Sequence, residues 1–223
     1  MKDKKIEKTI KNELVKPGFD LSIDYAEIGL DTFLDNEAIK EFPIVKSIIG
    51  GVKGIMAVRD IFSAKKLITF FKEFHSGSLS AEKRFEFLEK LNSDSKYRNS
   101  VIEQVTILNE RFISIEKSRI LSNLLKAHIN GKFDWEGFCQ LSECLDDIHT
   151  RAFGVLEETA KSERPFHLKT YEHEKDGGGV LFSAGLCIIH GNHYSVNAYG
   201  QCLYYYGILG DIDFEFPKNE TSN

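Results

Sequence analysis

Four side chains near the C-terminal end of the chain have the chemical types that bind zinc. Cys187, His190, His193 and Cys202 offer thiolate and imidazole ligands, which hold Zn²⁺ in tetrahedral protein sites. Residues 187 and 190 would point to opposite faces of a regular strand, and Cys202 falls in a Leu- and Tyr-rich helical pattern. We therefore favour ordinary buried cysteines and turn histidines, with Cys187, His190 and His193 kept as the candidate metal site.

Acidic residues alternate with apolar ones in the last segment before the C-terminus. Asp211, Asp213 and Glu215 are separated by Ile212 and Phe214, the period of a half-buried strand. The pattern predicts an edge strand or extended tail whose acids prevent pairing with other chains. One face of such a strand offers carboxylates to a cation, but solvated edge charges are the favoured interpretation.

Motifs of common enzymes are missing from the sequence. No GxSxG, GxGxxG, HExxH or EF-hand pattern occurs, and the glycine-rich run at residues 50–54 lacks the GxxxxGK[ST] order that places Lys and a hydroxyl on phosphate and metal. No cofactor is predicted, and the sequence favours a role without catalysis.

Charge is unevenly distributed along the chain. The net charge is −5, and seven of the 34 acidic but two of the 29 basic residues follow Thr170, so the body is neutral and the tail acidic. Neither part has the basic excess with which proteins neutralise phosphates, which disfavours nucleic acid as a partner. The N-terminus is too polar for a secretory signal, and the four cysteines lack CxxC spacing. We therefore expect a cytoplasmic protein with free thiols.

Helical periodicity dominates the first 74 residues. Ile6, Ile10 and Leu14 predict a lysine-rich amphipathic helix over residues 1–16, and a second helix is expected over 24–41. The stretch 42–74 is the most apolar helical segment, but lysines, Arg59 and Asp60 interrupt it too often for a transmembrane helix. A buried central helix or hairpin is the favoured interpretation.

The next ninety residues predict a helical bundle with short connections. Ser80 is expected to cap a helix that buries Phe85, and the following helix spans 97–112. A third helix should stop at Asn130-Gly131, and a fourth should begin at Asp134 and continue to about Lys161. Neighbouring helices should pack antiparallel.

The composition changes after Pro165. No charged residue occurs in the 31 positions from 180 to 210. We expect strands over 186–189 and 193–196, joined by Gly191-Asn192, and a helix over 197–209. The predicted fold is thus mainly α, a helical bundle over 23–164 with a basic amphipathic arm over 1–22 and a small α/β module with an acidic tail over 165–223.

The segment LFSAGLCIIHGNHYSVNAYGQCLYYYGIL resembles the closing part of a winged-helix module. The middle of the chain, with Asp35, Pro43, Gly51, Arg59-Asp60 and Lys65-Lys66, resembles a widespread group of uncharacterised small helical bacterial proteins that often end in such a module. This resemblance implies the fold and a bacterial origin, and no activity. The predicted wing, residues 187–196, has no Lys or Arg, so a winged-helix DNA-binding regulator is disfavoured.

The sequence therefore predicts a bacterial protein that acts through protein–protein contacts, in regulation or in conflict with mobile elements such as phage. The expected contact surface comprises Gly50, Gly51, Lys53, Gly54 and Arg59. The alternative is a membrane-active effector in which the 42–74 segment inserts into an anionic membrane, assisted by the basic N-terminal helix. The two hypotheses differ in whether Ile48, Val52 and Ile55 stay buried.

Overall fold

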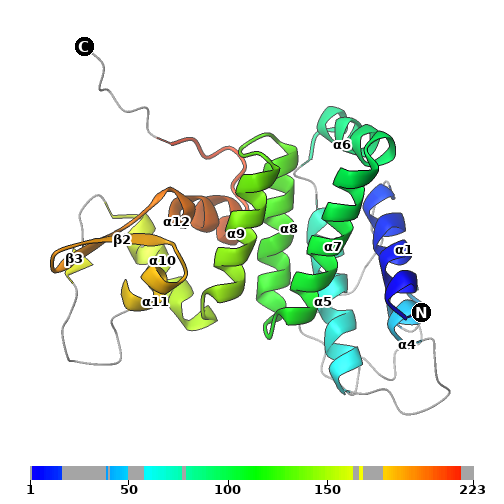
Figure 1. Cartoon of the computed structure of the whole chain (residues 1–223), viewed down its shortest axis with the longest axis horizontal. Helices are drawn as coiled ribbons and strands as arrows, with labels where there is room; N and C mark the ends of the chain where they lie inside the picture. The colour runs from blue at the N-terminus through cyan, green and yellow to red at the C-terminus, as the bar shows by residue number, and fades with distance from the viewer. Residues whose placement is uncertain are drawn as a thin grey trace.

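Helices make up most of the structure, so the expectation of a mainly α fold is confirmed (Figure 1). The computed structural model describes residues 2–16, 39, 41–49, 58–76, 79–162, 166–167 and 178–216. The predicted helix over 24–41 lies outside the described residues, apart from the buried Ile39 and from Glu41. In chain order, the helices of the first two thirds are α1 (Lys2–Val15), α4 (Pro43–Ile49), α5 (Val58–Phe74), α6 (Ala81–Ser93), α7 (Ser95–Arg111), α8 (Ile115–Ile129), α9 (Trp135–Asp147) and α10 (Phe153–Ala160).

Helix α8 occupies the centre of the bundle and packs against α5 and α9 (Figure 1). Its Leu121, Leu124 and Leu125 are fully buried, and Phe70 and Phe71 of α5 lie in the same core. At roughly 25 cal/mol per Å² of buried apolar surface, such residues supply the main driving force for folding. Helices α1 and α4 pack on each other and cover the outer side of α5 and α7.

Local sequence signals set the beginnings and ends of several helices. Ser80 caps α6, because its hydroxyl accepts a hydrogen bond from the backbone N–H of Lys83, and Asp134 caps α9 through Gly137 N–H. Helix α8 ends at Asn130, and Gly131 follows with a φ of 79°, a left-handed conformation that favours glycine. These capping predictions are confirmed.

Cationic side chains from neighbouring helices satisfy the carbonyls at several helix C-termini. On α8, Lys126 Nζ donates to Glu73 O at the end of α5 (2.8 Å), and Lys117 Nζ donates to Asp146 O at the end of α9 (2.8 Å). Lys66 of α5 does the same for Phe112 O at the end of α7 (2.6 Å). The last carbonyls of a helix lack partners within the helix and attract positive charge, so these buried lysines are structural. Burial lowers the pKa of Lys66 to about 8.

The C-terminal part contains a small antiparallel sheet in the order β1-β3-β2, from β1 (Phe166–His167), β2 (Cys187–His190) and β3 (His193–Val196). The β2-β3 hairpin turns at Gly191-Asn192 as predicted, although β2 begins one residue later than expected. Three further helical segments belong to this part: α11 (Gly178–Ser183), α12 (Ala198–Cys202) and the π-helix η2 (Leu203–Leu209). The helix predicted over 197–209 is present, with Asn197 as its cap, and its second half packs against α8.

Three local predictions are wrong. Phe85 is 62% exposed rather than buried, because the side of α6 that carries it faces away from the core formed by Phe87 and Leu91. The helix from Asp134 ends at Asp147, because Ile148 is extended and buried, and a short 3₁₀ turn η1 (Thr150–Ala152) separates it from α10. Of the two alternatives for the last segment, the edge strand is not formed: residues 212–213 make a turn in which Asp211 Oδ1 accepts from the backbone N–H groups of Asp213 and Phe214, and residues 214–216 have no regular secondary structure.

Candidate interaction surface

The side chains predicted as metal ligands lie at two ends of the β2-β3 hairpin. His190 and His193 are cross-strand partners at the turn, whereas Cys187 pairs with Val196 at the far end. Cys187 is buried, and its Sγ lies 3.5 Å from Gly178 O. In the part of the chain that the structure describes, no group of three His, Cys, Asp or Glu side chains is arranged to hold a metal ion. The structure therefore does not bring Cys187, His190 and His193 together as a metal centre.

Cys139, Cys144 and Cys202 lack the environment of a catalytic nucleophile. Burial raises the pKa of the Cys144 and Cys202 thiols to about 11, and burial together with Glu143 and Glu136 raises that of Cys139. A nucleophilic cysteine needs a depressed pKa and a nearby base. At neutral pH these three thiols are protonated and unreactive.

A buried Tyr97–His128 pair is the most chemically suggestive contact inside the bundle. Tyr97 Oη and His128 Nε2 are 2.9 Å apart, and His128 Nδ1 lies 3.0 Å from Phe133 O. Burial lowers the pKa of His128 and raises that of Tyr97, so both are neutral. The rings pack edge-on against Trp135, and neither residue lines any of the three pockets described below. The pair therefore joins α7 to α8.

Of the surface predicted from the glycine-rich segment, only Arg59 lies within the described residues; Gly50, Gly51, Lys53 and Gly54 lie outside them. Arg59 stands in the first turn of α5 with its side chain 79% exposed, and its Nη2 is 2.7 Å from Glu110 Oε1. A pair this exposed contributes little to stability, at most about 1 kcal/mol. The Arg59 side chain is thus exposed enough to contact a partner, and its ion pair links α5 to α7.

A pocket of 240 Å³ lies beside Arg59, between α1, α4, α5 and α7. Ile6, Ile48 and Leu67 form its apolar walls. Asn109 also lines it, donates Nδ2 to Val105 O, and leaves its buried Oδ1 without a hydrogen-bond partner. The pocket is small and has one unsatisfied acceptor, which a single water molecule can satisfy. A second pocket of 240 Å³ near Asp146 and Asp147 is lined by the exposed Ile113.

The apolar side of the segment before α5 is packed inside the protein. Ile44, Val45 and Ile48 of α4 are at most 4% exposed, and Ile10 and Leu14 of α1 cover them. Val52 and Ile55 lie outside the described residues. Across the described ranges, no helix is long and apolar enough to cross a membrane. The apolar side chains of α4 are therefore already buried within the bundle.

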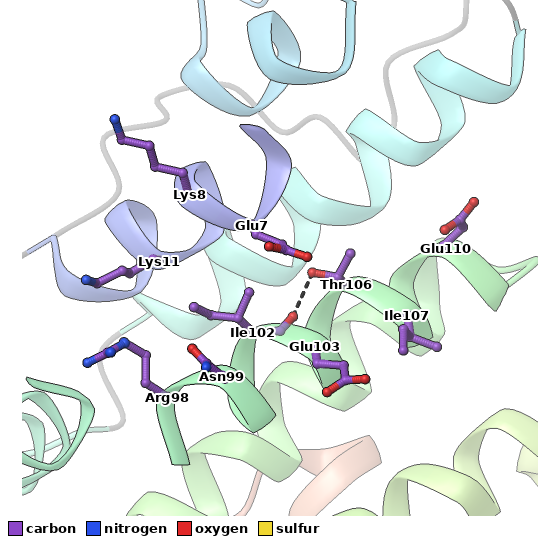
Figure 2. A pocket seen from close by; sticks show the side chains of 10 residues that line it. All are labelled: Glu7, Lys8, Lys11, Arg98, Asn99, Ile102, Glu103, Thr106, Ile107 and Glu110. Atoms are coloured by element: carbon purple, nitrogen blue, oxygen red, sulfur yellow. Dashed lines mark hydrogen bonds between the residues drawn. The ribbon is translucent and has the colours of Figure 1, made fainter. Parts of the chain in front are cut away.

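A hollow of 750 Å³ lies between α1 and α7 (Figure 2). Ile102 and Thr106 form its floor, and Ile107 is 43% exposed beside them. Thr106 Oγ1 donates to Ile102 O at 2.6 Å, so the floor is internally satisfied. We call this feature the α1–α7 groove, and its lining consists of Glu7, Lys8, Lys11, Arg98, Asn99, Ile102, Glu103, Thr106, Ile107 and Glu110.

Charged side chains of both signs line the α1–α7 groove. Lys8, Lys11 and Arg98 lie at one end, and Glu103, Ile107 and Glu110 lie towards the other (Figure 2). Glu7 lies near Thr106 in the middle, and Glu110 is paired with Arg59. Among the described residues, Lys8, Lys11 and Glu103 have no side-chain partner. Unpaired charges around an exposed apolar side chain are typical of the rim of a protein interface.

Sequence reasoning did not identify this groove. The sequence predicts a helix over 97–112 but does not indicate that one of its faces borders a groove, and Val101, Val105 and Leu108 of α7 are buried. Ile107 is the one signal that the sequence offered, because it is a large apolar residue on an otherwise polar face. The neighbouring helix α1 completes the groove, and nothing in the sequence shows that α1 packs there.

Comparison with known proteins gives no relative from which a function can be transferred: no protein-family model, curated protein or solved structure matches the chain significantly.

Proposed function

We propose that this protein acts by binding another protein surface and has no catalytic activity of its own. The observation that carries the proposal is the α1–α7 groove, where the exposed Ile107 lies beside Glu103 and Glu110 at one end and Lys8 and Lys11 line the other end. An apolar anchor within a polar, charged rim is the usual anatomy of a protein interface. Arg59 forms an ion pair with Glu110, which lines the same groove.

The distribution of perturbed ionisable groups supports a role without catalysis. The shifted pKa values of Lys66, Lys126, His75 and His128 belong to side chains that contact helix-end carbonyls or neighbouring helices. Active sites instead gather such groups in an open cleft. The α1–α7 groove is lined by exposed surface charges, which fit recognition better than acid–base chemistry.

The proposal also covers the C-terminal module, the cellular location and the biological role of the protein. The β1-β3-β2 sheet with α11 and α12 is proposed to be a winged-helix-like module that packs against protein, since its hairpin carries no Lys or Arg for phosphate contacts. The proposed setting is the bacterial cytoplasm, and the proposed role is regulation or conflict with mobile elements such as phage. The resemblance of the sequence supports that role.

Site-specific photo-cross-linking tests the proposal. A photoreactive phenylalanine replaces Ile107, and a matched protein carries it at Glu89, an exposed position of α6 that does not line the groove. Irradiation in the expressing cells should yield discrete protein adducts from position 107 and none from position 89. The same adducts should disappear when Lys8→Glu and Lys11→Glu are added. No adduct from position 107, or equal adducts from both positions, would overturn the proposal.

Liposome flotation separates protein binding from the membrane alternative. The purified chain is mixed with vesicles of phosphatidylcholine and phosphatidylglycerol at low and high salt, with an Arg59→Glu, Lys53→Glu variant as the comparison. We expect the wild type to stay with the unbound fraction, because Ile44, Val45 and Ile48 are already buried against α1. Salt-sensitive flotation that the variant loses would replace the protein-contact proposal with the membrane-active one.

A further inference from the structure

The pocket beside Arg59 has apolar walls that three packed helices hold in place. Ile6 of α1, Ile48 of α4 and Leu67 of α5 form these walls, and the last two are at most 5% exposed. Helix α4 packs against both α1 and α5, so the walls belong to the folded bundle. The volume of 240 Å³ exceeds the cavity of about 150 Å³ that binds benzene in an engineered protein interior.

Asn109 of α7 contributes an unsatisfied acceptor to this pocket. Its side chain is part of the lining, and the residue is 3% exposed. The orientation of the amide is fixed, because Nδ2 donates to Val105 O at 2.8 Å and a carbonyl oxygen can only accept. Oδ1 is therefore the atom without a partner, and a buried acceptor in this state is costly. A ligand with an N–H or O–H donor would satisfy it.

Ser63 of α5 adds a second hydrogen-bonding group to the lining. Its side chain is half-buried, and within the described ranges no hydrogen-bond partner is recorded for its hydroxyl. Thr106 of α7 differs, because its Oγ1 already donates to Ile102 O at 2.6 Å. A few polar groups placed among apolar walls are typical of sites that bind small molecules.

The charged residues of the lining do not require a charged ligand. Arg59 and Glu110 pair with each other at 2.7 Å, and their side chains are 79% and 61% exposed. Asp60 also has an interaction partner. The paired charges of Arg59 and Glu110 therefore lie towards solvent, whereas Ile48, Leu67 and Asn109 make the buried part of the lining neutral.

Water fills a pocket of this kind poorly. A water molecule takes up about 30 Å³ and needs two to four polar partners, so the volume corresponds to about eight waters. One water can satisfy Asn109 Oδ1, but further waters would lie against Ile6, Ile48 and Leu67, which offer no hydrogen bonds. Displacing such poorly held water by an apolar group favours binding.

We propose that this pocket binds a small neutral molecule with an apolar, ring-sized body and one N–H or O–H donor, of the size and chemistry of indole or phenol. The apolar body packs between Ile6, Ile48 and Leu67, and the donor bonds to Asn109 Oδ1. A ligand of only about nine non-hydrogen atoms should bind with a dissociation constant of about 0.1 to 1 mM.

Titration of the isotope-labelled full chain with indole and with benzofuran, followed by NMR, tests the site. Benzofuran has the shape of indole, but an oxygen replaces the N–H donor. We expect indole to bind saturably and to shift the backbone amide signals of Ser63, Leu67 and Asn109. Benzofuran should bind at least about fivefold more weakly, because it cannot donate to Asn109 Oδ1. This comparison uses the wild-type chain alone.

Two variants and one matched control locate the ligand. Ser63→Leu should fill the pocket and abolish indole binding. Asn109→Leu removes the acceptor and should bring the affinities for indole and benzofuran within about twofold of each other. Thr69→Leu also replaces a half-buried hydroxyl residue of α5, outside the lining of the pocket, and should bind indole as the wild type does. Urea unfolding checks that each variant remains folded.

Three results would overturn the inference. The first is the absence of saturable indole binding by the wild type, and the second is binding that Ser63→Leu leaves unchanged. The third is equal affinity of the wild type for indole and benzofuran, because the donor then has no role. The titration contains no partner protein, so this inference and the protein-contact function, which cross-linking at position 107 tests, can fail separately.

Discussion

The ammonium of Lys126 lies 2.8 Å from the backbone carbonyl of Glu73 and 2.7 Å from the carboxylate of the same residue. Lys126 stands on the central helix α8, with its side chain 3% exposed, and Glu73 stands in the last turn of α5. One cation therefore satisfies a helix-end carbonyl and neutralises a partly buried acid. The same contact fastens α5 to α8, the two helices at the centre of the bundle.

Replacing Lys126 by Met should destabilise the protein by about 3 kcal/mol. The substitution keeps most of the buried volume but removes the cation that pairs with the partly buried Glu73 carboxylate, and Ser76 remains as a neutral donor to the carboxylate and carbonyl of Glu73. Lys96→Met, on an exposed side chain, should change the free energy of unfolding by less than about 0.5 kcal/mol. Urea unfolding measures both, and equal effects of the two changes would contradict the role assigned to Lys126.

His75 should make the protein sensitive to mild acid. Its Nε2 lies 3.0 Å from Glu13 O and its Nδ1 accepts from Arg84 Nη2 at 2.9 Å, so the ring is held in the neutral form. Burial, with smaller contributions from Arg84 and Lys16, lowers the pKa of His75 to about 4. Because this pKa lies below the unfolded value of 6.5, the associated stability is present above pH 6.5 and is lost as the pH falls towards 4.

The expected loss between pH 7.5 and pH 5 is about 1 kcal/mol, less than the full shift implies because the ring is partly solvated. A His75→Gln variant, which keeps a donor without the titration, should lose less stability over the same interval. Urea midpoints at the two pH values provide the comparison. A variant with the same pH dependence as the wild type would show that other groups titrate instead.

Truncation of two phenylalanines that are two residues apart on α6 should change the free energy of unfolding by very different amounts. Phe87 is buried against Phe74 and Tyr97, so Phe87→Ala should cost about 3 to 4 kcal/mol through lost burial and a cavity. Phe85 is 62% exposed, so Phe85→Ala should change stability by less than about 0.5 kcal/mol. Thermal unfolding of both variants checks this assignment, and a large effect at Phe85 would place it in an interface.

Glycine at position 200 is required by the close approach of α12 to the sheet. A Cβ there would lie 2.3 Å from the carbonyl oxygen of Leu186 and 2.2 Å from Val196 Cγ2, and the backbone oxygen cannot easily move. Gly200→Ala should therefore destabilise the C-terminal part by about 2 kcal/mol or more. Gly154→Ala in α10 meets no atom within 4 Å and should stabilise the protein by about 0.5 kcal/mol. Calorimetry on the two variants gives the sign of each effect.

Features with a local cause could be read from the sequence. The end of α8 at Asn130-Gly131 and the caps Ser80 and Asp134 were predicted because one side chain or one left-handed glycine determines each. The hairpin around Gly191-Asn192 was predicted for the same reason. Each signal lies within a few residues of its effect.

Features that depend on packing between distant segments could not be predicted from the sequence. Phe85 fits a helical period as well as Phe87 does, and the positions of α5 and α7, whose Phe74 and Tyr97 contact Phe87, decide which of them is buried. The break at Ile148 has neither Pro nor Gly to mark it. The α1–α7 groove needs two helices more than eighty residues apart in sequence, so its lining residues could be named only after the fold was known.

The contacts of α8 also determine which segments of the protein should unfold together. Besides Lys126 and Lys117, this helix offers Asn123 Nδ2 to Gly207 O at 2.9 Å and Arg119 Nη1 to Ile208 O at 3.1 Å, near the end of η2. Unwinding α8 would expose the C-termini of α5, α9 and η2 at once. Amide hydrogen exchange should accordingly show these four segments exchanging as one cooperative unit at the global free energy of unfolding, while the more solvent-exposed α6 exchanges earlier.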